Sequence, residues 1–358
     1  MISDLYAFPP DMVAQTDELV KQLIMAHRRL AELKGVAPLL PNQEILLNTL
    51  TLQEAKDSSA LENIITSHDE LFKQELDIPQ FNNAAAKEVS RYSEALKHGF
   101  ERIKSQGQLT LDDLITIQTT LIIGKPGPGI RIKPGTNVVN KATGEIIYTP
   151  PQDHDQIVEL LERLIDFFNE DSNQVLDPLV KMALIHYQFE KIHPFYDGNG
   201  RTGRILNLLY LVKHGLLDLP ILYLSRFIVR EKSTYLAHFR EDPIDDNWET
   251  WLKFMLRGLE NTSSETIETI HKLKNLMVDY QERIKTQLPR VYSLDLLTTL
   301  FKHPYTKIDF VIRDVGVQRA AAARYLDTLA DAGFLEKQKL WRSSYYINKP
   351  LFELLQGR

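Results

Sequence analysis

The sequence contains no cysteine among its 358 residues. This absence excludes disulfide bonds, thiolate-ligated zinc, iron–sulfur clusters and cysteine nucleophiles. The first residues, MISDLYAFPPDM, also lack the basic start and the apolar stretch of a secretory signal. Since a chain without cysteine suits a reducing compartment, we expect a cytoplasmic protein.

Long hydrophobic runs are missing as well. The best candidate, residues 205–212, is far shorter than the roughly 18 apolar residues of a membrane span, and Asn207 interrupts it. We therefore expect no membrane contact. The composition, 43% hydrophobic and 25% charged, is typical of a globular protein with roughly two or three domains.

The net charge of −6 is unevenly distributed along the chain. Residues 290–358 carry 11 basic and 7 acidic side chains, a surplus of +4, whereas residues 1–289 carry 31 basic and 41 acidic ones, or −10. A mildly basic domain is more often a solvated surface than a nucleic-acid binder. A nucleic-acid partner for residues 290–358 is therefore only a hypothesis.

Amphipathic helical patterns dominate the chain. Within residues 16–33, leucines and an alanine recur at three- and four-residue steps, which places them on one helix face. Further helices are expected at residues 44–56, from 57–59 onward, and at 84–104, 111–122, 155–169, 178–191, 202–214, 242–260 and 263–285. This density predicts a mainly α protein whose body is a helical bundle.

Two segments differ from the helical bundle. Residues 130–149 hold two short runs rich in Val, Ile, Thr and Tyr around NKATGE, which predicts a β-hairpin, either a structural cover or a functional element. At the C-terminus we expect helices at 294–301, 309–314 and 318–332, with Gly316 in a turn, then strands at 334–341 and 345–349 separated by residues 342–344. That order predicts a winged helix–turn–helix domain. Its Arg319 and Arg324 are more simply explained as solvated residues than as nucleic-acid contacts.

The densest group of unusual residues is HPFYDGNGRTGR, from His193 to Arg204. Its glycines can expose successive backbone N–H groups at the start of a helix, where the helix dipole favours an anion such as phosphate. Arg201 and Arg204 are three residues apart, so we expect both guanidinium groups to reach the same polyphosphate. Asp197 is a hard oxygen ligand suited to Mg²⁺, and His193 is the natural general base.

Two other nucleotide-binding motifs are excluded. Residues 198–203 also spell GxGxxG, and Asp218 follows Gly198 by 20 residues, as in a dinucleotide-binding fingerprint. That fingerprint needs a preceding strand, but residues 177–191 have a helical pattern. The GxxxxGK[ST] loop of Walker-type ATPases is absent from the sequence.

HPFYDGNGRTGR resembles the HxFx(D/E)GNGRxxR signature of Fic-domain proteins at every fixed position. The resemblance extends to the flanking helices and the upstream hairpin, so it covers roughly residues 85–260. It implies an all-α Fic-type core, and most family members with the complete signature transfer AMP from ATP to a hydroxyl of a target protein.

The resemblance also implies roles for individual residues. His193 would take the proton of the attacking hydroxyl, Asp197 would hold Mg²⁺, and the hairpin 130–149 would be a flap that aligns the target segment. The implied ATP-binding residues are Gly198, Asn199, Gly200, Arg201, Thr202, Gly203, Arg204 and Tyr235. Tyr235 would lie near adenine, although a core tyrosine explains it almost as well.

A second pattern lies upstream, in the sequence SSALEN of residues 58–63. A local explanation is an S-x-x-E capping box of Ser59 and Glu62 at a helix start. Ser58, Glu62 and Asn63 also resemble the (S/T)xxxE(G/N) motif on the inhibitory helix of autoinhibited Fic proteins. The resemblance implies that Glu62 pairs with Arg204 and obstructs the γ-phosphate.

We therefore expect an autoinhibited protein adenylyltransferase that uses ATP and Mg²⁺. The expected parts are an N-terminal helical segment (1–84), a Fic core (85–260), a linking helix (261–289) and a winged helix domain (290–358). The target is a Tyr, Thr or Ser hydroxyl of another protein or of the chain itself, and a homodimer is possible within the family. Two alternatives stay open: an ATP-sensing DNA-binding or scaffolding regulator, and a Fic enzyme that removes AMP or transfers another phosphate-containing group.

Overall fold

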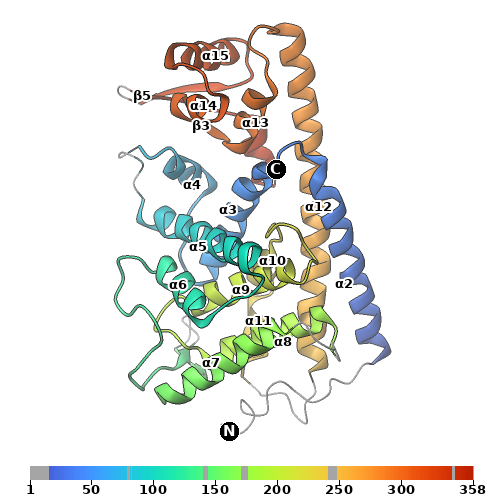
Figure 1. Ribbon diagram of the computed structural model, residues 1–358, viewed down its shortest axis with the longest axis vertical. Coiled ribbons are helices and arrows are strands. Elements are labelled where there is room, and N and C mark those ends of the chain that lie inside the picture. Colours follow the sequence, from blue (N-terminus) through green and yellow to red (C-terminus); the bar gives the residue numbers. More distant parts are fainter. Residues whose placement is uncertain are drawn as a thin grey trace.

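The structure is a computed structural model that is mainly helical, as predicted (Figure 1). It describes residues 16–78, 81, 83–139, 144–170, 176–240, 248–340 and 343–357. A helical body occupies one end, a small C-terminal domain occupies the other, and the helix α12 (Glu249–Gln287) runs alongside both. None of the helices in these residues is long and apolar enough to cross a membrane.

The body is built from short-looped helices around one apolar core. They are α2 (Asp17–Val36), the 3₁₀ helix η1 (Ala37–Leu39), α3 (Glu44–Leu61), α4 (His68–Glu75), α5 (Ala84–Gln106), α6 (Leu111–Leu121), α7 (His154–Asn169), α8 (Pro178–Ile192), α9 (Asn199–Lys213), α10 (Leu224–Arg230) and α11 (Lys232–Ala237). Side-chain caps define where several of these helices begin. The Asn83 side chain accepts hydrogen bonds from Ala85 N and Ala86 N, and Asp177 caps α8 with Pro178 in its first turn.

Three differences from the predicted elements have physical causes. The helix start expected at residues 57–59 is wrong, because α3 continues unbroken to Leu61. Asp57 and Ser58 bind the side chains of Arg226 and Arg204 instead of capping backbone N–H groups. The helices expected at 242–260 and 263–285 form the single helix α12, since no proline or cap interrupts the pattern between them; residues 242–247 lie outside the described part. The sequence interpretation did not include α4, α10 or α11.

The predicted hairpin is present as β1 (Val138–Val139) and β2 (Ile146–Tyr148), an antiparallel pair with Val138 opposite Tyr148. The residues between them, 140–143, lie outside the described part of the chain. Just before the hairpin, Ile130 forms a β-bridge with Phe195, and Arg131 N donates to Pro194 O over 2.9 Å. The hairpin segment is therefore fixed to the loop that carries the signature.

The C-terminal domain contains the predicted helices and hairpin with one further strand and one further helix. Its elements are α13 (Leu294–Lys302), β3 (Tyr305–Lys307), α14 (Ile308–Val315), α15 (Arg319–Asp331), β4 (Glu336–Leu340), β5 (Ser343–Ile347) and α16 (Lys349–Leu355). The three strands form one antiparallel sheet in the order β3-β5-β4. Trp341, expected at the end of the first strand, and Arg342, expected in the turn, lie outside the described residues.

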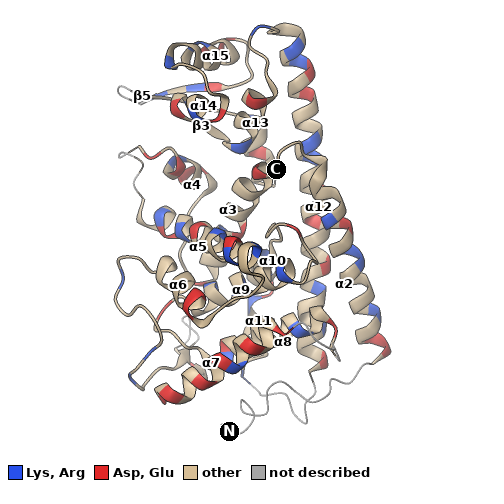
Figure 2. Ribbon diagram, in the orientation of Figure 1, with Lys and Arg blue, Asp and Glu red and all other residues tan. Residues whose placement is uncertain are grey.

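Charges at this end of the molecule are mixed in sign (Figure 2). Arg319 pairs with Asp309, and Lys337 pairs with Asp327, at N–O distances of 2.8 and 2.6 Å. The positive surplus of the domain is therefore partly neutralised beside its third helix, α15.

The C-terminal domain packs against α3 and α4. Gln53 on α3 donates from Nε2 to the carbonyl of Leu355 at 2.9 Å, and the Phe72 ring on α4 contacts the rings of Tyr305 and Phe352. Tyr305 also donates its hydroxyl to Asp69 at 2.6 Å. The helix α3 thus has the C-terminal domain near its middle and the signature helix α9 near its end.

Candidate nucleotide-binding and catalytic site

The signature forms the loop between α8 and α9. At its start His193 has a left-handed backbone with φ 48° and ψ 58°, and at its end Gly198 has φ 86°. The Asn199 side chain closes the loop, because its Oδ1 accepts from Phe195 N at 2.9 Å and its Nδ2 donates to Phe195 O at 2.7 Å. Asn199 therefore holds the loop with its side chain and leaves only its backbone for a ligand.

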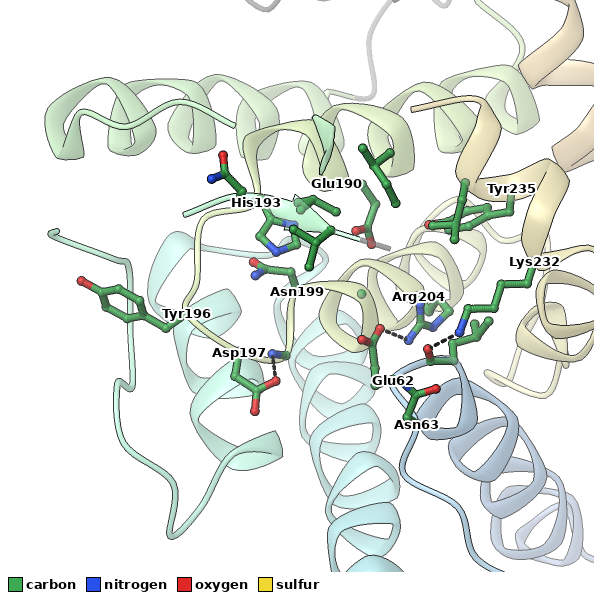
Figure 3. A pocket seen from close by; sticks show the side chains of 18 of the residues that line it. Glu62, Asn63, Glu190, His193, Tyr196, Asp197, Asn199, Arg204, Lys232 and Tyr235 are labelled. Atoms are coloured by element: carbon green, nitrogen blue, oxygen red, sulfur yellow. Dashed lines mark hydrogen bonds and ion pairs between the residues drawn. The ribbon is translucent and has the colours of Figure 1, made fainter. Parts of the chain in front are cut away.

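A cavity of about 740 Å³ lies over this loop. Its wall comes from the end of α3, the hairpin, the signature loop, the start of α9 and helix α11 (Figure 3). The lining residues are Leu61, Glu62, Asn63, Asn137, Val138, Val139, Ile147, Glu190, His193, Tyr196, Asp197, Gly198, Asn199, Gly200, Arg204, Lys232, Ser233, Tyr235 and Leu236. Nucleotide-sized ligands fit a cavity of these dimensions.

His193 lines the cavity and is partly buried. Burial lowers the pKa of His193 to about 4, with a smaller opposing effect from Glu62. The imidazole is therefore neutral near pH 7 and is free to accept a proton. Its backbone is also held, since Arg131 Nε donates to the His193 carbonyl at 2.9 Å.

The start of α9 is an anion site by its backbone. The first N–H groups of a helix have no acceptor within the helix, and the dipole adds positive potential there. Gly198, Asn199 and Gly200 all line the cavity at this point. A Cβ on Gly200 would collide with Glu62 Oε1, so the Glu62 carboxylate lies directly against the first turn of α9.

Arg204 connects the signature to α3. Its Nε donates to Ser58 Oγ at 2.7 Å, and its Nη2 donates to Ser58 O at 2.9 Å and to Glu62 Oε1 at 3.1 Å. Burial lowers the pKa of Arg204, but Glu62 together with Tyr235, Glu190 and Tyr92 outweighs this effect, and the pKa stands above its ordinary value. The expected pairing of Glu62 with Arg204 is thus present in the structure (Figure 3).

The end of α3 explains why Glu62 reaches this position. Glu62 is the C-cap residue of α3, and Asn63 follows with φ 64°. Ser59 lies inside the helix with a buried side chain, so the capping box of Ser59 and Glu62 is not formed. Asn63 suits this helix end because asparagine tolerates the left-handed conformation.

Arg201 does not reach the cavity. Its side chain is completely buried, donates to Glu88 Oε1 at 2.9 Å and lies 3.3 Å from Asp197 Oδ1. Three residues along an α-helix rotate the side chain by roughly 300°, so Arg201 and Arg204 point about 60° apart. The expectation that both arginines grip one polyphosphate is not met in this structure.

Thr202 and Gly203 also lie away from the cavity wall. Thr202 is buried, and its N–H continues the helix by donating to Gly198 O at 2.9 Å. A Cβ on Gly203 would crowd Glu190 Oε1 and the Phe189 ring, so glycine is needed for helix packing. These two residues shape α9 rather than contact a ligand.

Asp197 is partly exposed at the cavity edge. Burial raises its pKa, but the charges of Arg201 and Lys125 outweigh this and hold the pKa of Asp197 below its ordinary value. Lys125 Nζ lies 3.3 Å from Asp197 Oδ2 and also pairs with Glu88. Among the described residues no group of three or more His, Asp or Glu side chains could hold a metal ion by itself.

Tyr235 lines the cavity and is also part of the core. Its hydroxyl lies 3.0 Å from His186 Nε2, and its ring contacts Phe239 and Trp251. Tyr235 therefore lies at the boundary between the core and the cavity, and its position near adenine stays a prediction.

Several residues at the site had no motif that could reveal them. Glu190 lines the cavity beside Arg204, and burial raises its pKa to about 7. Lys232 lines the opposite wall and donates to Leu61 O at 2.9 Å. Glu88 and Tyr148 reach the signature from more than 40 residues away in the sequence, so only the fold brings them there.

Three family models match the chain one after another. The Fic/DOC family N-terminal model matches residues 20–101, the Fic/DOC family model matches residues 108–211, and the C-terminal domain model of SoFic-like protein adenylyltransferases matches residues 276–351. The chain therefore belongs to the Fic/DOC family.

Curated relatives are similar at modest identity. The chain is 28% identical over 267 residues to a probable protein adenylyltransferase of Aquifex aeolicus, covering 72% of this chain and 75% of that protein. It is 29% identical over 114 residues to protein adenylyltransferase fic-1 of Caenorhabditis elegans, covering 31% of this chain. The chain spans only about a fifth, 21%, of the length of that relative.

Solved structures share the fold. A Fic family protein from Desulfovibrio desulfuricans G20 superposes with a TM-score of 0.60 at 18% identity, covering 93% of this chain and 97% of that one. A Fic domain containing signaling protein from Bacteroides thetaiotaomicron gives a TM-score of 0.56 at 18% identity, covering 69% and 97%. The arrangement of the helices is thus that of known Fic proteins.

Proposed function

We propose that the chain is a protein adenylyltransferase that transfers AMP from ATP to a Tyr, Thr or Ser hydroxyl of a target protein. The observation that carries this proposal is that His193, the first turn of α9 and Arg204 all line one cavity of about 740 Å³. The names of the Aquifex and Caenorhabditis relatives support the same activity.

The proposed step needs little covalent chemistry from the protein. His193 takes the proton of the target hydroxyl, the hydroxyl oxygen forms a bond to the α-phosphorus, and the bond to the β-phosphate bridging oxygen breaks to release pyrophosphate. The N–H groups of Gly198 to Gly200 stabilise the negative charge of the phosphates, and Arg204 binds their far end. The neutral state of His193 at pH 7 is the state that this step requires.

Asp197 fits the protein's share of a Mg²⁺ site. Mg²⁺ bound to a nucleotide takes most of its ligands from phosphate and water and needs only one or two carboxylates. A bound Mg²⁺ would neutralise phosphate charge during transfer. Lys125 now pairs with the same carboxylate, so Lys125 would have to turn away from Asp197.

We also propose that Glu62 restrains the enzyme. Its carboxylate lies against the first turn of α9 and is paired with Arg204, so a nucleotide must compete with it for both the backbone N–H groups and the guanidinium. Autoinhibition follows because two anions cannot occupy this position together.

Incubation with alpha-labelled ATP and Mg²⁺ tests both proposals. We expect Glu62→Gly to gain at least about 10-fold in labelling over wild type, the size of a typical coupling of 1–3 kcal/mol. In that background His193→Ala should reduce labelling to the level of a sample without enzyme. No gain in Glu62→Gly would refute the restraint, and labelling that survives His193→Ala would refute the assigned base.

A further comparison separates transfer from removal of AMP. The Glu62→Gly variant is incubated with a pre-labelled target in the absence of ATP, and release of labelled AMP is followed. Faster release than with wild type would show that the same site removes AMP. The proposed homodimer and a nucleic-acid partner of residues 290–358 stay predictions, to be checked by sedimentation equilibrium and by salt-dependent binding of duplex DNA.

A further inference from the structure

Tyr148 on β2 touches the catalytic histidine, although no motif includes it. Its oxygen lies 3.5 Å from His193 Nδ1, and the two rings meet edge to face with centroids 6.4 Å apart. The hydroxyl also donates its hydrogen to the backbone carbonyl of Glu190, in the last turn of α8. The hairpin therefore contacts both the imidazole and the helix that precedes it.

These contacts favour one ring nitrogen of His193 as the carrier of the proton. A phenol has a single hydrogen, and in Tyr148 that hydrogen is given to the Glu190 carbonyl. Towards His193 the oxygen therefore acts as an acceptor, which favours a proton on Nδ1, and a hydrogen bond with the backbone of Glu190 adds to the same preference by raising the pKa of His193. In the neutral imidazole Nε2 then has the free lone pair that a general base needs.

The position of the Tyr148 ring does not depend on its hydroxyl. The ring packs against Phe239 with centroids 6.1 Å apart, and the Lys191 ammonium lies 4.8 Å from the ring centroid. Burial raises the pKa of Tyr148 well above its ordinary value, so the hydroxyl keeps its hydrogen at neutral pH. Removal of the oxygen alone is therefore a clean perturbation.

We propose that Tyr148 is a positioning residue of the hairpin, which holds His193 in the tautomer with Nδ1 protonated and Nε2 free for the reaction. This inference rests on the proposed role of His193 as the base. It gives the hairpin a second role, since β1 and β2 line the cavity and, through Tyr148, also set the state of the base. A hairpin displaced from α8 would leave the imidazole without this support.

The experiment compares Tyr148→Phe with Thr149→Val, each alone and with Glu62→Gly. Thr149 is the next residue of the hairpin, and its hydroxyl donates to Asn137 Oδ1 at 2.8 Å without touching His193. Both variants lose one hydroxyl of the hairpin, so Thr149→Val controls for a general loosening. Thermal melting checks that both variants fold.

The first readout is the ¹⁵N spectrum of the full chain labelled at its 10 histidines, with His193→Ala used to assign the signal. We expect wild type and Thr149→Val to show His193 protonated at Nδ1, and Tyr148→Phe to show a mixture of tautomers. This measurement needs no nucleotide or target, so it tests the inference even if the chain transfers no AMP. An unchanged tautomer in Tyr148→Phe overturns the inference.

The second readout is the rate of transfer in the Glu62→Gly background. Tyr148→Phe should lower kcat about 10-fold, less than the roughly 100-fold or more that the general base itself contributes, and leave the KM for ATP within about twofold. Thr149→Val should keep kcat within about twofold of its parent. An equal loss of kcat in both variants would overturn the specific role of Tyr148.

Discussion

Arg201 and Arg204 stand one turn apart on α9, and both side chains are buried. Arg201 shares a group of two cations and two carboxylates with Lys125, Glu88 and Asp197. Arg204 faces two acids, since Glu62 pairs with it and the charge of Glu190 also acts on it. One side of α9 is thus balanced in charge, and the other has an excess of acid.

The origin of these partners differs as well. Glu88 comes from α5 and its side chain is 14% exposed, whereas Asp197 comes from the signature loop and lies at the cavity edge. Glu62 is the C-cap residue of α3 and has a side chain that is 30% exposed. Loss of Glu88 would leave the completely buried Arg201 guanidinium without its main partner and would destabilise the fold, whereas the part-exposed Glu62 carboxylate can be displaced by a ligand. We therefore expect Arg201 to serve stability and Arg204 to serve function.

The largest expected effect comes from removing Arg204. In the Glu62→Gly background, Arg204→Ala should lower kcat/KM for ATP about 100-fold, the size expected when one donor to developing phosphate charge is lost. Steady-state labelling at varied ATP measures it. A loss below about threefold would show that Arg204 does not contact the nucleotide in the reaction.

The second effect concerns stability on the balanced side. Glu88→Ala removes the hydrogen-bonded partner of a completely buried guanidinium and should lower the free energy of unfolding by about 3 kcal/mol. Glu62→Ala should lower it by about 1 kcal/mol, because Arg204 keeps its two bonds to Ser58. Urea unfolding measures both variants. Equal losses in the free energy of unfolding would mean that the Arg201 and Arg204 sides of α9 do not differ in their effect on stability.

A third effect is the pH dependence on the acid-rich side. The pKa of Glu190 is raised to about 7 by burial, so the folded state binds a proton more tightly than the unfolded state. Its contribution to stability is present below pH 4.5 and is lost as the pH rises to about 7. Glu190→Gln should gain on the order of 2 kcal/mol relative to wild type between pH 5 and pH 8.

Other buried acids also make the stability of wild type depend on pH. Burial raises the pKa values of Glu54 and Glu75 to about 7, so wild type loses stability with rising pH for several reasons. Only the difference between wild type and Glu190→Gln isolates Glu190. The charge of Glu62 contributes to the raised pKa, so Glu62→Gly should reduce the difference. If the difference in the free energy of unfolding between wild type and Glu190→Gln does not vary with pH, the proposed excess of acidic groups around Arg204 is contradicted.

The smallest effect is expected at Asn63. Its φ of 64° suits glycine at least as well as asparagine, so Asn63→Gly should change the free energy of unfolding by less than about 0.5 kcal/mol and leave labelling unchanged. Chemical denaturation and the labelling assay check this. A marked rise in labelling would mean that the Asn63 side chain itself helps to hold Glu62.

Much of the fold was readable from the sequence, because helix periodicity and local caps are properties of neighbouring residues. The amphipathic patterns predicted most helices of the body, and the hairpin was visible as a change of composition. The capping box at Ser59 shows the limit of such local reasoning. Its residues fit a helix start, yet α3 continues through them, and Asp57 and Ser58 bind distant arginines.

Some residues of the site could also be predicted from the sequence, and others could not. The signature and the SSALEN pattern led to His193, Asp197, Arg204 and Glu62, which the structure brings to one cavity. Helical spacing did not show that Arg201 turns away, because Glu88 lies 113 residues earlier in the chain. For the same reason Tyr148 carried no signal as a residue in contact with the base, since a hydroxyl in a short strand has no distinctive pattern.

The helix α12 sets limits on how the two ends of the molecule can be rearranged. Its 39 residues span roughly 58 Å as one rod, and the domain at its far end also holds α3. Inserting one residue into α12 would rotate the C-terminal domain by about 100° about the helix axis. Inserting a whole number of turns would keep the orientation of the domain but move it away from Gln53. No insertion preserves both angle and distance, so a change in the length of α12 would separate the C-terminal domain from α3.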